Sequence, residues 1–314
     1  MKNIRTISSL SLLLGLLLQG CGHLDTPFAP GATTTAAGPA PFTAPVFNKT
    51  FSPVQDTQSS YPSGIACDTA NHFLYVTDMA LNQVFKMDMN GNRLGQWGNL
   101  GPNALDQPQG IAVHNGNVYV ADSGNARIVE FDPNGNLIAT LQPTEGEYYL
   151  FIYPTGVFFD NQGNLYVADN SDSIYRFDQT LTLTGQFNGN GSMNFPANAS
   201  EDTNGNIYVA NYDSDQVLKL ASSGNLIATW GQTGSAAGQF SGPADVKVDG
   251  SGKVYVVDSL NDRVETFDAN GNFLAQFGTA QGLSEPNGMT MDSNGNIFVA
   301  DTGNGRIVEY SPAN

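Results

Sequence analysis

Three stretches of the chain combine an acid, an amide and a base at one fixed spacing. In each, an Asp is followed three residues later by Asn and five residues later by Arg. The triplets are Asp122, Asn125 and Arg127; Asp258, Asn261 and Arg263; and Asp301, Asn304 and Arg306. Such groups can form an ion pair or supply proton transfer in catalysis. A catalytic group is not needed in three copies, so we interpret Asp122–Arg127, Asp258–Arg263 and Asp301–Arg306 as structural pairs.

A second acidic pattern, Asp-x-Asn-Gly-Asn, recurs along the chain, as at residues 132–136, 268–272 and 292–296. Its oxygen atoms could bind calcium, but the pattern lacks the ligand series and the closing Glu of an EF-hand. Asp and Asn also form tight turns with their own backbone, and Gly supplies the positive φ that such turns need. We therefore interpret these segments as hairpin turns. No cofactor is assigned, and a calcium-type ion elsewhere in the molecule stays open.

Aromatic residues gather in the segment 145–153, which contains Tyr148, Tyr149 and Phe151. Rings of this kind can stack on a sugar or grip a peptide, and they can equally pack beneath a longer loop. Tyr212 and Asp213 are expected on the same face of the molecule. We take these five residues as candidates for ligand binding.

The sequence gives little support for the common catalytic centres. Its three histidines are His23, His72 and His114, too few and too scattered for a His-ligated zinc site. It contains neither a Gly-rich phosphate loop nor a Gly-x-Ser-x-Gly elbow. We predict no catalytic residue and assign no metal ligand.

These residues are set in a repeat of 42 to 47 residues that occurs six times. One anchor is a proline three residues before an apolar residue, and the other is a short apolar strand ending in Asp or Asn. The prolines are Pro62, Pro108, Pro154, Pro196, Pro243 and Pro286, and the strand ends are Asp78, Asp122, Asp169, Asn211, Asp258 and Asp301. Each repeat contains four short strands separated by Asn-Gly turns. The pattern predicts an all-β, six-bladed β-propeller of four-stranded antiparallel blades.

The last repeat lacks its outermost strand, because only four residues follow Tyr310. The segment 46–51 precedes the first repeat and can supply the missing strand. We therefore predict that an N-terminal strand closes the last blade and leaves no open sheet edge.

Blades four and five depart from the repeat at positions that could bind a ligand. Asn198 and Asp245 replace the Gly that follows each proline by two residues, and Asn211 replaces the strand-end Asp. If innermost strands begin at one face, Asn198 and Asp245 lie near the channel mouth. We add these three residues to the binding candidates, with repeat drift and a local salt bridge as the alternative. Glu201 would lie between blades and need a partner.

The strings VYVADSGNARIVEFD and IFVADTGNGRIVEY resemble NHL repeats, and the resemblance extends over residues 46–314. It implies a module that binds proteins or other ligands. Propellers similar to gluconolactonase bind a calcium-type ion through acids and amides at the channel mouth, but their motifs are not found here. Fold alone does not choose between these functions.

The N-terminus is typical of a bacterial lipoprotein. Lys2 and Arg5 precede an apolar run too short to span a bilayer, and the run leads into Leu-Gln-Gly-Cys ending at Cys21. We predict a signal peptide over 1–20, a lipid on Cys21, a Pro-, Ala- and Thr-rich tether over 21–45 and the propeller over 46–314. An ordinary signal peptide with a coincidental Cys is the alternative. Gly22 implies the outer membrane if the cell is Gram-negative.

The formal net charge is −17, from 12 basic and 29 acidic residues. A chain this acidic repels nucleic acid, which we exclude as a partner. The sequence predicts a cell-envelope lipoprotein whose propeller is a binding platform for a protein, peptide or glycan. The alternatives are a metal-dependent hydrolase or lyase resembling gluconolactonase, and a purely structural envelope protein.

Overall fold

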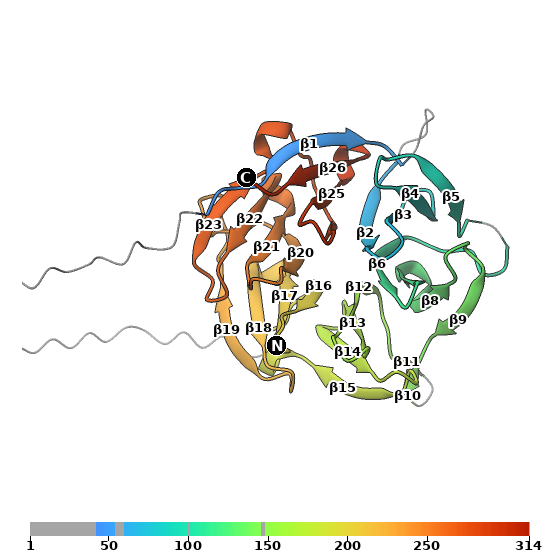
Figure 1. The fold of residues 1–314 in the computed structure, drawn as a ribbon. Helices are drawn as coiled ribbons and strands as arrows, with labels where there is room; N and C mark the ends of the chain where they lie inside the picture. Colours follow the sequence, from blue (N-terminus) through green and yellow to red (C-terminus); the bar gives the residue numbers. More distant parts are fainter. Residues whose placement is uncertain (1–41, 54–59, 100, 146–147, 314) are drawn as a thin grey trace, which may run out of the picture. The chain divides into compact units, whose positions relative to one another are not determined.

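A computed structural model describes residues 42–313 except 54–59, 100 and 146–147. It contains six four-stranded antiparallel sheets arranged as blades around a centre (Figure 1). In blades one to five the first strand of the repeat is innermost and the fourth lies at the perimeter. The predicted six-bladed propeller is confirmed.

The blades follow the chain in order. Blade one consists of β2 (Pro62–Asp68), β3 (Phe73–Asp78), β4 (Gln83–Asp88) and β5 (Arg93–Trp97). Blade two consists of β6 (Pro108–His114), β7 (Asn117–Asp122), β8 (Arg127–Phe131) and β9 (Leu137–Leu141). Blade three consists of β12 (Pro154–Phe159), β13 (Leu165–Asp169), β14 (Ser173–Phe177) and β15 (Leu183–Phe187).

Blade four consists of β16 (Pro196–Glu201), β17 (Ile207–Asn211), β18 (Gln216–Leu220) and β19 (Leu226–Trp230). Blade five consists of β20 (Pro243–Val248), β21 (Val254–Asp258), β22 (Arg263–Phe267) and β23 (Phe273–Phe277). Blade six consists of β24 (Met289–Met291), β25 (Ile297–Asp301), β26 (Arg306–Ser311) and β1 (Val46–Phe51).

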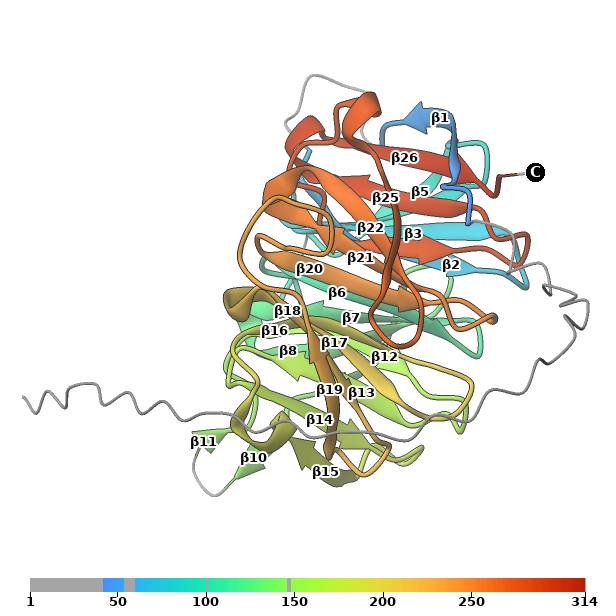
Figure 2. The same ribbon diagram turned by 90° about the vertical axis from the view of Figure 1, so that its left-hand side faces the viewer.

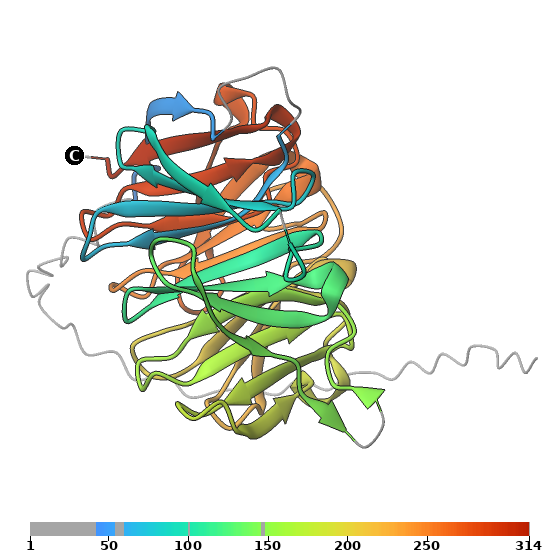
Figure 3. The same ribbon diagram turned by 90° about the vertical axis from the view of Figure 1, so that its right-hand side faces the viewer.

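Smaller elements lie in the connections. The 3-10 helices are η1 (Ser123–Asn125), η2 (Gly189–Gly191), η3 (Tyr212–Ser214), η4 (Ser259–Asn261), η5 (Thr279–Gln281) and η6 (Thr302–Asn304). A hairpin of β10 (Thr144–Glu145) and β11 (Tyr148–Tyr149) precedes blade three and projects from the edge of the ring (Figures 2 and 3).

The ring is closed by pairing the two ends of the propeller. Strand β1 pairs antiparallel with β26, with Val46 opposite Ser311 and Phe51 opposite Ile307. The prediction that segment 46–51 completes blade six is confirmed. Phe42 and Ala44, placed in the tether by the sequence, pack against the apolar cluster of blades five and six.

The turns within blades are held by their own Asp side chains. Asp132 Oδ1 accepts hydrogen bonds from the backbone N–H groups of Asn134 (2.8 Å) and Asn136 (2.9 Å), and Oδ2 accepts one from Asn136 Nδ2 (2.7 Å). The hydrogen bond from the Asn136 side chain contributes most to lowering the pKa of Asp132. Residues 268–272 and 292–296 form the same turn, so these segments are hairpin turns, as predicted.

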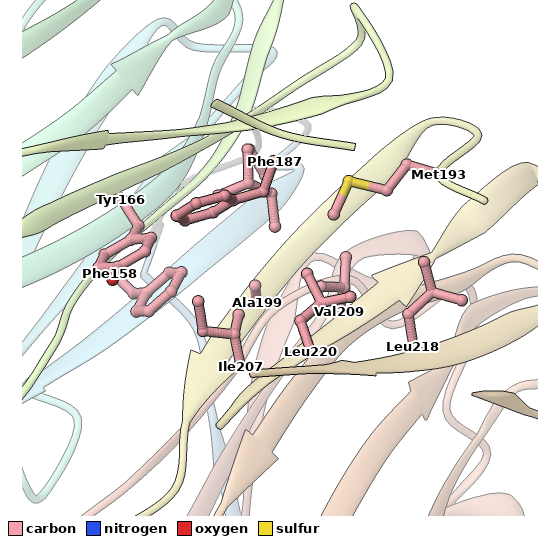
Figure 4. Packing of buried hydrophobic residues seen from close by; sticks show 11 residues of the cluster. Phe158, Tyr166, Phe187, Met193, Ala199, Ile207, Val209, Leu218 and Leu220 are labelled. Carbon is pink, nitrogen blue, oxygen red and sulfur yellow. The ribbon is translucent and has the colours of Figure 1, made fainter. Parts of the chain in front are cut away.

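Neighbouring blades are joined by apolar side chains from facing sheets. Figure 4 shows one such cluster, in which Phe158, Tyr166 and Phe187 of blade three lie beside Ile207 and Leu218 of blade four. The rings of Phe158 and Tyr166 stack with their centroids 4.7 Å apart. Because the inner strands of each sheet are buried on both faces in this way, several of them read as nearly continuous apolar runs in the sequence.

The predicted Asp–Arg pairs lie where the second strand of a blade ends and the third begins. Arg127 Nε is 2.6 Å from Asp122 Oδ2, and Arg263 Nε is 2.8 Å from Asp258 Oδ2. Arg306 Nε is 2.6 Å from Asp301 Oδ2. The three Asp side chains are fully buried and the Arg side chains lie closer to solvent.

The carboxylate of each pair also holds the link that enters its blade. Asp301 Oδ1 accepts a hydrogen bond from the backbone N–H of Ser284 (2.7 Å), and Arg306 Nη2 donates to the carbonyl oxygen of Gln281 (2.8 Å). The pair therefore fixes a strand end and a link at once, which gives these residues a structural role.

We expect Asp301→Ala to lower the free energy of unfolding by about 3–5 kcal/mol, because it leaves the guanidinium of Arg306 and the N–H of Ser284 without their acceptor. Urea unfolding measures this loss. Adding Arg306→Met should cost less than the sum of the single changes. Asp213→Ala, at an exposed carboxylate, is the control and should change stability by less than about 0.5 kcal/mol. Additive losses would contradict a coupled pair.

Candidate functional site

The innermost strands of all six blades begin around a small cavity at the channel mouth. Its volume is about 60 Å³, room for a few water molecules. One lining residue from each blade is Ser63, Gln109, Thr155, Asn198, Ala244 and Asn287. Each of the twelve lining residues is uncharged, so the mouth offers hydroxyl, amide and backbone groups.

Close approach of the backbones keeps the mouth narrow. A Cβ on Gly288 would lie 2.5 Å from the carbonyl oxygen of Ser63 in the next blade. A Cβ on Gly156 would lie 2.8 Å from the carbonyl oxygen of Ala197. Both distances are shorter than a van der Waals contact allows, so glycine is required at these positions.

Asp245 occupies the glycine position in blade five and bridges to blade six. Its Oδ1 accepts hydrogen bonds from Val246 N (2.8 Å) and Lys247 Nζ (2.8 Å), and its Oδ2 accepts one from Met289 N (2.7 Å). Burial raises the pKa of Asp245, and the nearby Lys247 opposes this shift. The structure therefore has the salt bridge that the sequence left as the alternative to ligand binding.

Asn198 occupies the same position in blade four and lines the cavity. Its Oδ1 accepts a hydrogen bond from the N–H of Ala199 (2.9 Å). No partner for its NH₂ group is found among the described residues. Asn198 is therefore the candidate with a free donor at the mouth.

Two other candidates are structural. Asn211 is fully buried; its Oδ1 accepts from Asn194 N (2.7 Å), and its Nδ2 donates to Ser192 O (3.0 Å). Phe151 is only 2% exposed and packs edge-on against Tyr175 and Phe177. Its assignment to a ligand-facing set is corrected, because its ring is part of the apolar core between blades two and three.

Tyr212 lies at the cavity and is half-buried. Its ring lies 5.6 Å from that of Phe195, which lines the same cavity. Burial raises the pKa of Tyr212, and the negative charge of Asp213 raises it further. The hydroxyl of Tyr212 therefore remains a hydrogen-bond donor at neutral pH. Asp213 is exposed beside it.

The remaining sequence candidates are only partly described or lie outside the described residues. Tyr148 and Tyr149 form β11, but their side chains are not described. Cys21 lies outside the described residues. Glu201 is half-buried, and its Oε2 accepts a hydrogen bond from Asn161 N (2.9 Å).

The structure adds residues that the sequence analysis missed. Phe195 directly precedes an anchoring proline, which places it on the link into blade four. Tyr61 and Ile152 occupy the corresponding links of blades one and three and are 45% and 65% exposed. The signal for all three was an aromatic or large apolar residue within two positions of the repeat proline.

In residues 42–313, apart from the gaps, no three His, Cys, Asp or Glu side chains are grouped to hold a metal ion. His72 and His114 lie at the opposite ends of the innermost strands from the mouth. None of the helices in the described ranges is long and apolar enough to cross a membrane.

We expect Lys247→Met to destabilise the protein by about 3–5 kcal/mol near pH 8, because Asp245 stays buried without its counter-ion. Since the pKa of Asp245 is raised in the folded state, its contribution to stability falls as pH rises. The loss should therefore be smaller at pH 5. Chemical unfolding at both pH values measures the difference, with Lys253→Met as control. Equal losses at the two pH values would contradict this account.

Comparison with known proteins agrees with this architecture. The NHL repeat model matches residues 105–131 and 283–310, in blades two and six. A gluconolactonase from Xanthomonas campestris is similar with a TM-score of 0.66 and 15% identity, covering 82% of this chain and 87% of that one.

Two lyases have similar folds. Virginiamycin B lyase from Staphylococcus aureus, in a catalytically inactive form with quinupristin, gives a TM-score of 0.62 and 12% identity, covering 84% of this chain and 87% of that one. A streptogramin B lyase is similar with a TM-score of 0.61 and 15% identity, covering 85% of this chain and 87% of that one. Such low identities establish a shared fold and nothing more. This chain is a six-bladed β-propeller in which blades two and six match the NHL repeat.

Proposed function

We propose that this protein is a lipoprotein of the bacterial cell envelope whose propeller is a binding platform for a protein, peptide or glycan. The observation that carries the proposal is the channel mouth, where uncharged hydroxyl and amide groups are flanked by the rings of Phe195 and Tyr212. Neutral polar groups beside aromatic rings suit a sugar or a peptide backbone.

The ligand would lie over the mouth, because the cavity of about 60 Å³ is too small for a sugar ring or a large side chain. Asn198 would donate from the cavity, and Tyr212 would offer its ring and hydroxyl beside it. Tyr61 and Ile152 extend the apolar part of this face along the incoming links.

The alternative is a metal-dependent hydrolase or lyase, which the fold similarity to gluconolactonase favours. Acidic ligands at the mouth would support it, but Asp245 is engaged by Lys247 and Met289 N. Asp213 adds one exposed carboxylate beside Tyr212.

The virginiamycin B lyase is catalytically inactive when one of its histidines is replaced by alanine. In this chain His72 and His114 lie away from the mouth. Stoichiometric bound metal together with lactone hydrolysis would favour the alternative.

The lipid on Cys21 would insert in the outer membrane if the cell is Gram-negative. The Pro-rich tether would hold the propeller away from the membrane surface. The partners would then be proteins, peptides or glycans of the envelope. The net charge of −17 supports the exclusion of nucleic acid.

We expect Cys21→Ala to abolish incorporation of a labelled fatty acid and to move the protein from the detergent phase to the aqueous phase in detergent partitioning. Cys67→Ala is the matched control, because the Cys67 thiol lies within the propeller and should not affect labelling. Labelling that survives Cys21→Ala would contradict lipidation there.

We expect Asn198→Ala and Tyr212→Phe each to weaken binding by about tenfold, since each removes one hydrogen bond from the ligand. Arrays of envelope glycans and peptides would identify a ligand, and calorimetry would measure its affinity. Tyr212→Phe keeps the ring that packs on Phe195, so its melting temperature should not change. His72→Ala, at the opposite end of the ring, is the control. Unchanged affinity in both mouth variants would place the binding face elsewhere.

A further inference from the structure

A larger cavity lies between blades two and three, at the end of the ring opposite the channel mouth. Its volume is about 290 Å³. We call it the amine cavity and define it by His114, Tyr119, Glu130, Phe159, Asp178 and Gln179. A small apolar pocket shares Tyr119, Glu130 and Leu181 with it.

The walls of the amine cavity combine aromatic rings with two carboxylates, Glu130 and Asp178. Asp178 Oδ1 accepts hydrogen bonds from Thr180 and Thr182 of its own turn.

His114 stacks on Phe159 with centroids 4.2 Å apart, and Tyr119 meets Phe159 edge-on at 4.7 Å. Glu130 Oε1 accepts hydrogen bonds from Tyr119 Oη (2.7 Å) and Asn117 Nδ2 (2.7 Å). For Glu130 Oε2 no partner is found in the described ranges. The half-buried carboxylate therefore presents one oxygen atom to the cavity.

In two other gaps between blades a lysine side chain fills this place. Lys86 lies opposite Tyr75 in blade one, at the position that Glu130 takes opposite Tyr119. Its Nζ donates to Pro133 O in blade two (2.9 Å) and lies 4.0 Å from the centroid of the Phe73 ring.

Blade four repeats this arrangement. Lys219 lies opposite Tyr208, and its Nζ donates to Ala269 O in blade five (3.2 Å). It lies 4.9 Å from the centroid of the Tyr208 ring. In both gaps an ammonium group joins one blade to the second residue of a hairpin turn in the next.

The gap between blades six and one supplies the closest template. Here the position is held by Glu309, and the ammonium comes from Lys49 on the closing strand β1. Lys49 Nζ lies 3.2 Å from Glu309 Oε2 and donates to Met89 O in blade one (2.8 Å). Asn48 Nδ2 donates to Glu309 Oε1 (2.6 Å), as Asn117 does to Glu130. The set is a carboxylate, an ammonium and a hairpin carbonyl.

The gap between blades two and three has two members of this set. Glu130 provides the carboxylate. Gln179 is the second residue of its hairpin turn, as Met89, Pro133 and Ala269 are of theirs, and its backbone provides the hairpin carbonyl. No Lys or Arg pairs with Glu130 in the described parts of the chain. We propose that the amine cavity binds the primary ammonium group of an aminoalkyl ligand, either a free alkylamine or a lysine side chain.

Each part of the ligand has a matching wall. The ammonium would bind Glu130 Oε2 and donate to the carbonyl oxygen of Gln179, beside the rings of Tyr119 and Phe159. The alkyl stem would lie toward Leu181 and the small apolar pocket. The cavity of 290 Å³ has room for a stem the length of a lysine side chain.

The test is calorimetry of the purified full chain with n-butylammonium chloride, with n-butanol as the uncharged probe. We expect saturable binding of one amine per chain and none of the alcohol. Glu130→Gln should weaken amine binding at least tenfold. Glu285→Gln removes the same charge from an exposed site elsewhere and should leave binding unchanged. No binding, or equal binding by the Glu130→Gln variant, would overturn the proposal.

A second variant tests the template itself. In Glu130→Lys the introduced side chain should occupy the cavity as Lys86 does in its own gap. We expect loss of amine binding and a rise in melting temperature of about 1–3 °C. A lower melting temperature, or unchanged amine binding, would count against the proposal. Cadaverine and a lysine blocked at both backbone ends separate the sources. Binding of the blocked lysine supports a lysine side chain as the ligand, and binding of cadaverine alone restricts the ligand to free amines.

Discussion

The architecture depends on one hydrogen bond that every blade repeats: the residue ending the second strand accepts a backbone N–H from the link that enters the blade. Asp122 accepts from Asp106 N at 2.7 Å, and Asn211 accepts from Asn194 N at 2.7 Å. An uncompensated carboxylate buried at this place would be costly, so further donors surround it. The bond fixes where each innermost strand begins, and through it the position of every group at the channel mouth.

The repeat made the fold predictable, because six copies of one spacing report strands, turns and closure together. Side-chain direction on the links was not predictable, and the contrast between Phe151 and Ile152 shows why: adjacent apolar residues point to the core and to solvent. The partners of Asp245 were not predictable in full either, because Lys247 and the N–H of Met289 meet at its carboxylate only when blades five and six pack. The amine cavity was missed for the same reason, since Glu130 is informative only beside the blade that follows.

The two ends of the ring use different chemistry. At the mouth the backbones approach closely, so most of the groups that line it are small, and all are uncharged. At the other end the gaps between blades are wide enough for long side chains, and Lys86 and Lys219 fill them. Variation of the repeat therefore has different consequences at each end. A change at the mouth, as at Asp245, must be neutralised locally, whereas a change in an outer gap can leave an open space.

Glu130 illustrates how such a space persists without destabilising the fold. Its carboxylate receives hydrogen bonds from Tyr119 and Asn117 and is only half-buried, so water can solvate the remaining oxygen atom. The equivalent Glu309 is more deeply buried and has Lys49 as its counter-ion. Burial and pairing thus vary together across the two gaps. A ligand that brings its own ammonium would displace water from Glu130 and would stabilise the folded state in proportion to its affinity. The contact between blades two and three would then be completed by the ligand, as β1 completes the contact between blades six and one.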